Sequence, residues 1–130
     1  MQEYARSLGL QDEVVWVEKI TDVHLADLYS AALMTIVPSF EEGFGIPPLE
    51  AMRCRCPVIS SSSASMPEVC GDGAIYFDPK DVEGLKSALD AVLSNAVLAD
   101  QLKARGAVQA EKYTWDQTAL GVWECLQRES

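Results

Sequence analysis

The sequence predicts an α/β fold, a Rossmann-like parallel sheet with flanking helices. Short apolar runs alternate with longer segments in which apolar residues recur at helical spacing, which is typical of parallel strands joined by crossover helices. Of the 130 residues, 48% are apolar, which is enough for one hydrophobic core. No repeat or linker divides the sequence, so we expect one domain over residues 1–130.

The first third of the chain alternates between helical and extended patterns. Residues 1–9 are typical of the end of a helix that stops at a glycine, and the apolar run V-V-W-V at 14–17 predicts a strand. Residues 21–32 begin with a capping Thr or Asp and carry apolar residues at near-helical spacing, which predicts a helix. The apolar run at 33–37, ended by a proline, predicts a second strand.

The rest of the chain continues this alternation. A glycine- and proline-rich turn leads into a short predicted helix that contains residues 49–52. Two further strands are predicted, at 57–60 and at 73–77. From residue 81 onward the pattern is helical, and we expect the last helix at about 116–128.

Charge and composition exclude several classes of function. The formal net charge of −10 repels polyanions, so we expect no nucleic-acid partner. The sequence contains neither an apolar run of about 20 residues nor a signal-peptide pattern, and we expect a cytoplasmic protein without a transmembrane segment. The cysteines lack the spacing of a zinc site, and we expect free thiols and no bound metal. These cysteines are Cys54, Cys56, Cys70 and Cys125.

The segment 38–52, P-S-F-E-E-G-F-G-I-P-P-L-E-A-M, carries the candidate chemistry. A strand ends, a glycine-rich loop follows and a helix begins, so several backbone N–H groups and a helix N-terminus point at one spot, which suits phosphate oxygens. Gly43 and Gly45 allow close approach of a ligand to the backbone. In an open parallel sheet the ligand crevice lies at the carboxyl ends of the strands, where this loop falls.

Two carboxylates flank the glycine-rich loop. Glu42 precedes the glycines and Glu50 lies in the helix that follows, so both side chains can face one crevice from different sides. Paired carboxylates at a sugar site bind hydroxyl groups or stabilise an oxocarbenium-like transition state. Their spacing alone fits equally well with an alternative in which neither residue binds a ligand, Glu42 being a solvated turn residue and Glu50 an exposed helix residue.

The same segment resembles the group-one glycosyltransferase family, retaining enzymes of GT-B architecture with the hallmark P-S-x-x-E-G-F-G-x-P-x-x-E-A-M. The chain matches this hallmark at Pro38, Ser39, Glu42, Gly43, Phe44, Gly45, Pro47, Glu50, Ala51 and Met52. Segments at 25–32, 56–60, 66–79 and 113–115 also resemble family segments, in family order. The resemblance covers nearly the whole chain.

The resemblance implies the donor-binding part of a retaining enzyme that transfers a hexosyl group from a nucleotide-sugar to a sugar, lipid-linked or polysaccharide acceptor. Glu42, the candidate catalytic residue, would contact hydroxyls of the transferred sugar near its reacting face, and Glu50 would hold the ribose hydroxyls. The backbone N–H groups of residues 43–45 would receive the sugar or the diphosphate, and Leu49 would pack near the ribose. The implied donor-binding residues are Glu42, Gly43, Phe44, Gly45, Leu49 and Glu50.

The family also implies the ligands. The donor would be a UDP-, GDP- or ADP-sugar, with no cofactor and no metal in this domain, because the helix dipole and basic side chains neutralise the leaving diphosphate. Glu68 follows a serine-rich stretch near the same crevice, and it is a further candidate that would support the donor-contacting residues without touching the donor itself. The three tryptophans, Trp16, Trp115 and Trp123, are expected to pack in the core rather than to stack on sugars.

The chain departs from the family in two ways. Glu18 and Arg55 stand where the family usually has glycine, at places that need room or an unusual φ. The family also carries an acceptor domain and two opening strands, with an Arg or Lys pair, before this region. We therefore expect a partial C-terminal GT-B domain that lacks the first two strands, is inactive alone, and is completed by the N-terminal acceptor domain, another chain or self-association. The alternative is a noncatalytic nucleotide-binding or partner-completed module of the same fold.

Overall fold

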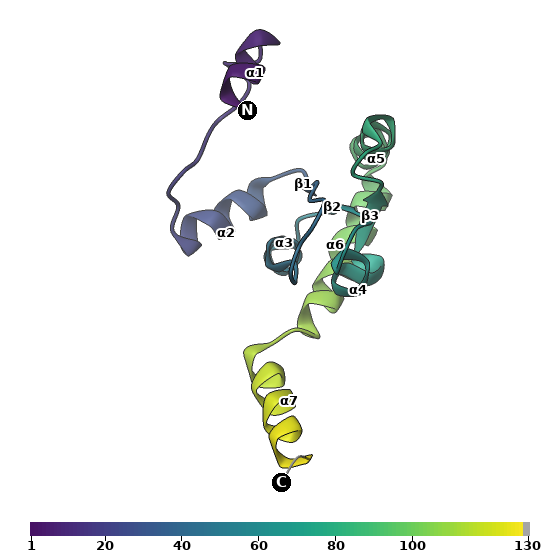
Figure 1. The fold of residues 1–130 in the computed structure, drawn as a ribbon. Helices are drawn as coiled ribbons and strands as arrows, with labels where there is room; N and C mark the ends of the chain where they lie inside the picture. Colours follow the sequence, from purple (N-terminus) through teal and green to yellow (C-terminus); the bar gives the residue numbers. More distant parts are fainter. Residues whose placement is uncertain (129–130) are drawn as a thin grey trace.

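The computed structural model describes residues 1–128, and within them three strands form one parallel sheet (Figure 1). The strands are β1 (Thr35–Val37), β2 (Val58–Ser61) and β3 (Ala74–Phe77), in the spatial order β1-β2-β3. Both neighbouring pairs are parallel, so the carboxyl ends of the strands meet at one edge of the sheet. The predicted α/β fold with a parallel sheet and flanking helices is confirmed.

Helices surround this sheet and extend beyond it. They are α1 (Gln2–Ser7), α2 (Asp22–Ala31), α3 (Ile46–Arg53), α4 (Met66–Cys70), the 3₁₀ turn η1 (Gly71–Gly73), α5 (Val82–Ser94), α6 (Ala96–Glu111) and α7 (Trp115–Arg128). Polar side chains cap four of them, because a side-chain oxygen before the helix accepts a hydrogen bond from a backbone N–H of its first turn. These capping residues are Thr21, Asp81, Asn95 and Thr114.

The central strand β2 separates two apolar clusters, because alternate residues of a strand point to opposite faces of a sheet. Val58 belongs to the cluster under α3, α4 and the end of α6, and Ile59 to the cluster under α5 and the middle of α6. All residues of β2 are buried, as a strand covered on both faces requires. Helix α6 therefore contributes to both clusters, with Leu102 in one and Ala110 in the other.

A pair of glycines lets α6 approach the sheet layer closely. A Cβ on Gly73 would lie 2.8 Å from the Cα of Gly106, and a Cβ on Gly106 would lie 2.9 Å from the Cγ of Met52. No side chain fits between these backbones. The contact fixes α6 against α3, the helix that follows the glycine-rich loop.

The two ends of the described chain leave this packed body. Helices α1, α2 and α7 contain no buried residue. In Figure 1, α1 lies apart from the sheet at the end of an extended segment, and α7 projects away from it on the opposite side.

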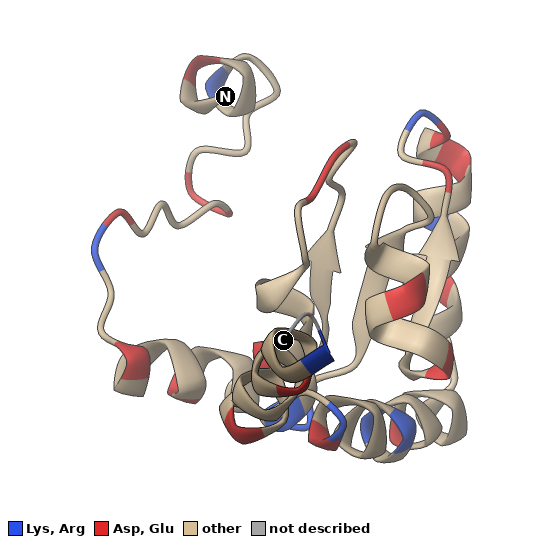
Figure 2. Cartoon of the chain, turned by 60° about the horizontal axis from the view of Figure 1, so that its bottom comes forward, with Lys and Arg blue, Asp and Glu red and all other residues tan. Residues whose placement is uncertain are grey.

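Acidic residues are spread over helices and loops rather than gathered on one element (Figure 2). None of the helices within residues 1–128 is long and apolar enough to span a membrane.

The prediction of a strand at 14–17 is wrong. These residues are outside any strand, and Val15 is 85% exposed and Val17 55% exposed. A β-strand exists through hydrogen bonds to a neighbouring strand, and no described strand lies beside this run. Apolar, β-branched residues are therefore insufficient here to form a strand.

Candidate functional site

The glycine-rich loop links β1 to α3 and turns at Gly45. Gly45 is the N-cap of α3 and has a φ of +97°, a left-handed conformation that L side chains rarely adopt. A Cβ at this position would also collide with the Cε of Met66. Pro47 and Pro48 lie in the first helical turn and carry no N–H. The amides available to a ligand at this helix start therefore come mainly from the loop itself.

Glu42 is held by a neighbour within the same motif. The hydroxyl of Ser39 donates a hydrogen bond of 3.0 Å to Oε1 of Glu42, and both side chains are half-buried. A carboxylate that accepts a hydrogen bond in a half-buried place has a restricted orientation. Glu42 is thus a hydrogen-bond acceptor with a fixed orientation at the start of the glycine-rich loop, rather than a freely solvated turn residue.

Glu50 lies on α3 and is contacted from α2. The phenol of Tyr29 donates to Oε2 of Glu50 over 3.5 Å, and Glu50 is half-buried. Burial, and then the neighbouring Glu50 carboxylate, raise the pKa of Tyr29, so the phenol keeps its proton and remains a donor. The second carboxylate therefore has a hydrogen-bond partner of its own.

A cavity of about 750 Å³ opens between the loop, the outer side of α3 and the junction of α6 with α7. This volume is within the range of small-molecule sites. Its lining consists of Phe44, Ile46, Leu49, Glu50, Arg53, Tyr113, Thr114, Trp115, Asp116 and Thr118. Among the predicted site residues, it brings together Phe44, Leu49 and Glu50, whereas Glu42, Gly43, Gly45 and Glu68 are not part of its lining.

Tyr113 is the residue that joins the parts of this cavity. Its ring packs edge-on against Phe44, with 5.6 Å between the ring centroids. Its hydroxyl donates to the backbone oxygen of Glu68 over 3.2 Å, and its own carbonyl accepts from Nη2 of Arg53 at 2.7 Å. Arg53 also donates to the carbonyl of Ala110 at 3.2 Å, so it holds the end of α6 beside α3.

Sequence reasoning missed both Arg53 and the position of Trp115. Arg53 follows Glu50 by three residues, which places it one helical turn further along α3, and this spacing could have indicated a cation beside the cavity. The expectation that Trp115 packs in the core is wrong, because it is 84% exposed at the start of α7. Trp16 and Trp123 are also exposed, at 45% and 58%. The segments that carry these tryptophans, residues 15–20 and α7, contain no buried residue.

Glu68 lies on α4 with an exposed side chain. Its link to the site runs through its backbone oxygen, which accepts from Tyr113, and not through its carboxylate. From this side, Ser65, immediately before α4, donates a hydrogen bond to the glycine-rich loop, and Met66 packs against Gly45.

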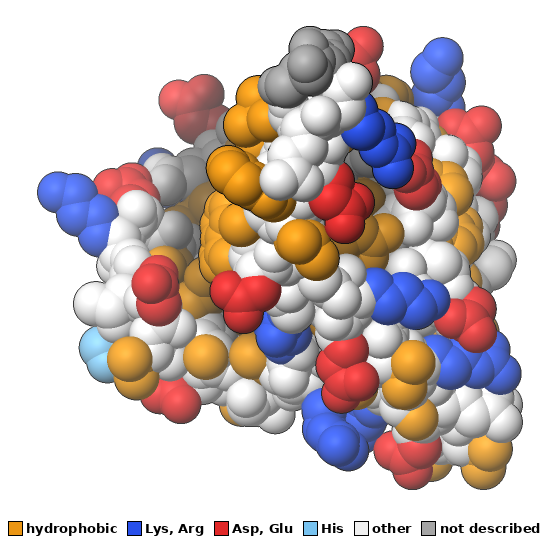
Figure 3. Space-filling model, turned by 90° about the horizontal axis from the view of Figure 1, so that it is seen from below, with side chains coloured by type: hydrophobic (Ala, Val, Ile, Leu, Met, Phe, Trp, Pro, Cys, Tyr) orange, Lys and Arg blue, Asp and Glu red, His pale blue; other side chains and the backbone are white. Residues whose placement is uncertain are grey.

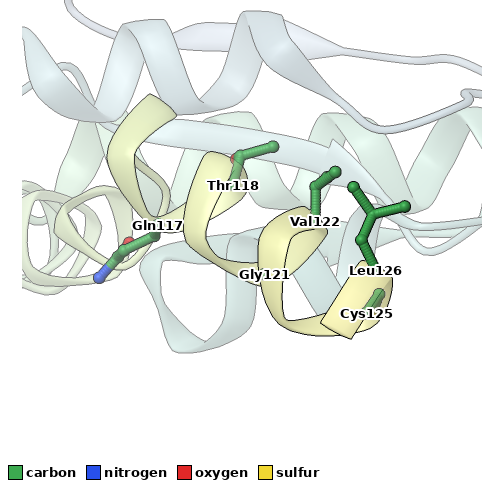
Figure 4. A pocket seen from close by; sticks show the side chains of 6 residues that line it. All are labelled: Gln117, Thr118, Gly121, Val122, Cys125 and Leu126. Carbon is green, nitrogen blue, oxygen red and sulfur yellow. The ribbon is translucent and has the colours of Figure 1, made fainter. Parts of the chain in front are cut away.

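A second hollow of about 400 Å³ lies along one side of α7 and contains none of the predicted site residues (Figure 4). It is lined by Gln117, Thr118, Gly121, Val122, Cys125 and Leu126. Seen from below, hydrophobic side chains are exposed across this face of the molecule, with acidic and basic side chains between them (Figure 3). The sequence signals for this surface are the amphipathic pattern of α7 and its two tryptophans.

The cysteines are free thiols. Cys56 and Cys70 are buried, Cys54 is half-buried and Cys125 is exposed. Burial raises the pKa of Cys70 to about 11, so this thiol is protonated at neutral pH and is a poor nucleophile. Within residues 1–128, no three His, Cys, Asp or Glu side chains gather in a way that could hold a metal ion.

With this geometry in place, comparison with known proteins finds a family and several relatives. Residues 1–109 match the family described as glycosyl transferases group 1. The chain is 36% identical over 116 residues to the serotype-specific mannosyltransferase WbdA of Escherichia coli, an alignment that covers 88% of this chain and 14% of the relative.

Two solved structures extend the similarity to the fold. A sucrose-phosphate synthase from Thermosynechococcus elongatus is 28% identical with a TM-score of 0.88, over 97% of this chain and 32% of that one. The C-terminal domain of a glycosyl transferase group 1 family protein from Francisella tularensis is 26% identical with a TM-score of 0.71, over 85% of this chain and 58% of that one. The chain therefore spans a minor part of the full-length relatives.

Proposed function

We propose, on the premise that this chain belongs to the group 1 glycosyl transferase family and has the fold of its C-terminal domain, that it binds a nucleotide-sugar donor at the glycine-rich loop. The observation that carries the proposal is the cavity next to that loop, which Phe44, Leu49 and Glu50 line together. A cavity of mixed apolar and charged lining suits a ligand with a nucleoside at one end and polar groups at the other.

Each candidate residue has a role in this proposal. The carboxylate of Glu50 accepts hydrogen bonds from the two ribose hydroxyls, and Leu49 packs beside the ribose. Glu42, held by Ser39, accepts from hydroxyls of the transferred sugar and stabilises positive charge that develops at its reacting carbon. The N–H groups of Gly43, Phe44 and Gly45 donate to oxygens of the sugar or the diphosphate.

The reaction we propose for the whole enzyme is the transfer of a hexosyl group from a UDP-, GDP- or ADP-sugar, with retention of configuration, to a sugar, lipid-linked or polysaccharide acceptor. The similarity to a mannosyltransferase favours mannose as the hexose. Transfer requires donor and acceptor to be held together, and the described cavity offers one wall of such a site. We therefore expect residues 1–130 alone to bind the donor without turning it over, and an acceptor-binding domain or partner chain to supply the rest.

Calorimetric titration of the purified chain tests the proposal. UDP, GDP, ADP and their hexose conjugates are added to the wild type and to the variants Glu50→Gln and Glu42→Gln. Glu83→Gln, an exposed carboxylate on α5, is the matched control. We expect saturable binding of one nucleotide, weakened about tenfold or more in Glu50→Gln, because charge-assisted hydrogen bonds contribute roughly 1.5–3 kcal/mol.

The conjugates distinguish the two carboxylates. Glu42→Gln is expected to weaken the binding of the sugar conjugate and to leave the affinity for the bare nucleotide unchanged, since Glu42 is assigned to the sugar. Absence of binding by a folded wild-type chain would overturn the proposal. Equal affinity in Glu50→Gln and Glu83→Gln would remove Glu50 from the site.

The alternative is a noncatalytic nucleotide-binding module of the same fold. It is favoured by the lining of the cavity, which includes Leu49 and Glu50 but not Glu42, the residue assigned to the transferred sugar. Nucleotide affinity that is the same with and without the sugar, and that is insensitive to Glu42→Gln, would support this alternative over the donor site.

A further inference from the structure

The glycine-rich loop is held from the side of α4 by a residue outside the recognised motif. The hydroxyl of Ser65 lies 3.0 Å from the backbone oxygen of Phe44 and 3.4 Å from that of Glu42. A serine hydroxyl has one hydrogen, so the shorter contact is the main bond and the longer one shares it. Ser65 is half-buried, and the next residue, Met66, is fully buried beneath Gly45.

Holding these two carbonyls fixes the direction of two amides. In a planar trans peptide the C=O of one residue and the N–H of the next point in opposite directions. The carbonyls of Glu42 and Phe44 point toward Ser65, so the N–H groups of Gly43 and Gly45 point away from α4. Within residues 1–128 neither N–H donates a hydrogen bond to the protein; Gly43 is exposed to solvent, and Gly45 is buried at the start of α3.

The loop needs such a tether because packing holds it at Gly45 but not at Gly43. Gly43 has no atom within 4 Å of where a Cβ would stand, so packing does not restrain it. Pro47 and Pro48 provide no N–H at the start of α3, which leaves the loop amides as the principal donors there. An unrestrained loop would lose ligand affinity, because the orientation of these amides would have to be fixed during binding.

We propose that Ser65 is a positioning residue, whose hydroxyl orients the amides of Gly43 and Gly45 toward anionic or hydroxyl oxygens of the ligand. The identity of that ligand, a nucleoside diphosphate or its sugar, rests on the proposed function. The orientation of the amides does not, because it follows from the contacts of the ligand-free chain.

Two variants and a control isolate the hydroxyl. Ser65→Ala removes the donor, and Ser65→Thr keeps it. Ser87→Ala removes a similar bond elsewhere, in which Ser87 donates to the carbonyl of Glu83 on α5. Thermal unfolding of all three checks that each is folded, and Ser65→Thr reports on the hydroxyl even where Ser65→Ala is less stable.

The first measurement uses ¹⁵N-labelled chain without ligand. We expect Ser65→Ala to shift the amide resonances of Gly43 and Gly45 and to lower their order parameters, Ser65→Thr to restore them, and Ser87→Ala to leave them unchanged. Unchanged Gly43 and Gly45 resonances in Ser65→Ala would overturn the inference, whether or not the chain binds a nucleotide.

The second measurement titrates UDP, GDP and ADP and their hexose conjugates. We expect Ser65→Ala to weaken binding by about three- to tenfold, as the loss of one neutral hydrogen bond does, and Ser65→Thr to recover it. Wild-type affinity in Ser65→Ala would refute a positioning role in binding. If the wild type binds none of these ligands while the amide resonances respond as expected, the proposed function fails and the orienting role of Ser65 stands.

Discussion

The phenol oxygen of Tyr29 lies 3.5 Å from Oε2 of Glu50, and this contact joins α2 to the helix that follows the glycine-rich loop. Helix α2 has no buried residue, and Tyr29 is its half-buried member that packs against the cluster under α3. Within residues 1–128 the other carboxylate oxygen of Glu50 makes no hydrogen bond. One oxygen is thus engaged by the protein while the other remains available to a ligand.

Replacing Tyr29 with Phe tests this contact. The variant keeps the ring in the cluster and removes the hydroxyl, so we expect a loss of about 0.5–1 kcal/mol in the free energy of unfolding, the lower part of the range for one hydrogen bond because 3.5 Å is long. Urea unfolding measures it, with Tyr4→Phe on α1, whose side chain is 70% exposed, as control. Equal urea midpoints for the two variants would show that the Tyr29 hydroxyl contributes nothing to the free energy of unfolding.

Arg55 occupies a position that suits glycine. It follows the end of α3 and has a φ of +56°. Its N–H donates a hydrogen bond to the carbonyl of Met52 at 3.0 Å, and the N–H of Cys56 donates to the carbonyl of Ala51 at 2.9 Å. This is the Schellman pattern, in which the left-handed residue is usually glycine. A side chain there costs about 1 kcal/mol or more in backbone strain.

We therefore predict that Arg55→Gly raises the free energy of unfolding by about 0.5–1 kcal/mol, because relief of the left-handed strain exceeds the entropy that glycine adds to the unfolded chain. Urea unfolding gives the change. Glu18→Gly is the matched control, since the resemblance implies glycine at this position as well, but Glu18 has no positive φ. A gain of the same size in Glu18→Gly would contradict the explanation through φ.

These cases show which features the sequence could predict. The strands at 35–37, 58–61 and 74–77 were predictable because each lies in a short run that carries apolar residues, and the central strand is buried on both faces. The run at 14–17 has the same local pattern and forms no strand, because pairing depends on a neighbour that local pattern does not encode.

The site divides in the same way. The glycine-rich loop between β1 and α3 was predictable, since its residues are adjacent in sequence. The contacts that hold it were not, because Ser65 is 21 residues from Phe44 and Tyr113 is 45 residues from Glu68. Such contacts depend on how α4 and α6 pack against the sheet, and no spacing rule for single residues predicts them.

The two glycines of the loop are predicted to differ in their tolerance of alanine. Gly45 has a φ of +97° and its Cβ would collide with Met66, so Gly45→Ala should lower the free energy of unfolding by about 1–3 kcal/mol. Gly43 has open space and no positive φ, so Gly43→Ala should change it by less than about 0.5 kcal/mol. Thermal or urea unfolding of the pair decides, and similar losses in both would argue against the left-handed turn at Gly45.

Stability at alkaline pH should depend on Cys70 and Tyr76. Burial raises the pKa of Cys70 from 9.0 to about 11, and burial, with the neighbouring Cys70 and Asp72, raises the pKa of Tyr76. Both groups are neutral when protonated, so the folded state holds their protons more tightly than the unfolded chain does. Their stabilisation is complete below the unfolded pKa and is lost as the pH rises through the folded pKa.

The free energy of unfolding should therefore fall between pH 9 and about 11, the window set by the two Cys70 values. Urea midpoints measured at half-unit steps from pH 8 would show it. In Cys70→Ala the decline should be shallower than in the wild type, whereas Cys125→Ala, which removes an exposed thiol, should follow the wild type. Comparing slopes rather than absolute stabilities separates the titration from the cavity that Cys70→Ala creates, because the cavity destabilises equally at every pH. Parallel slopes for wild type and Cys70→Ala would mean that the thiol does not titrate in this window.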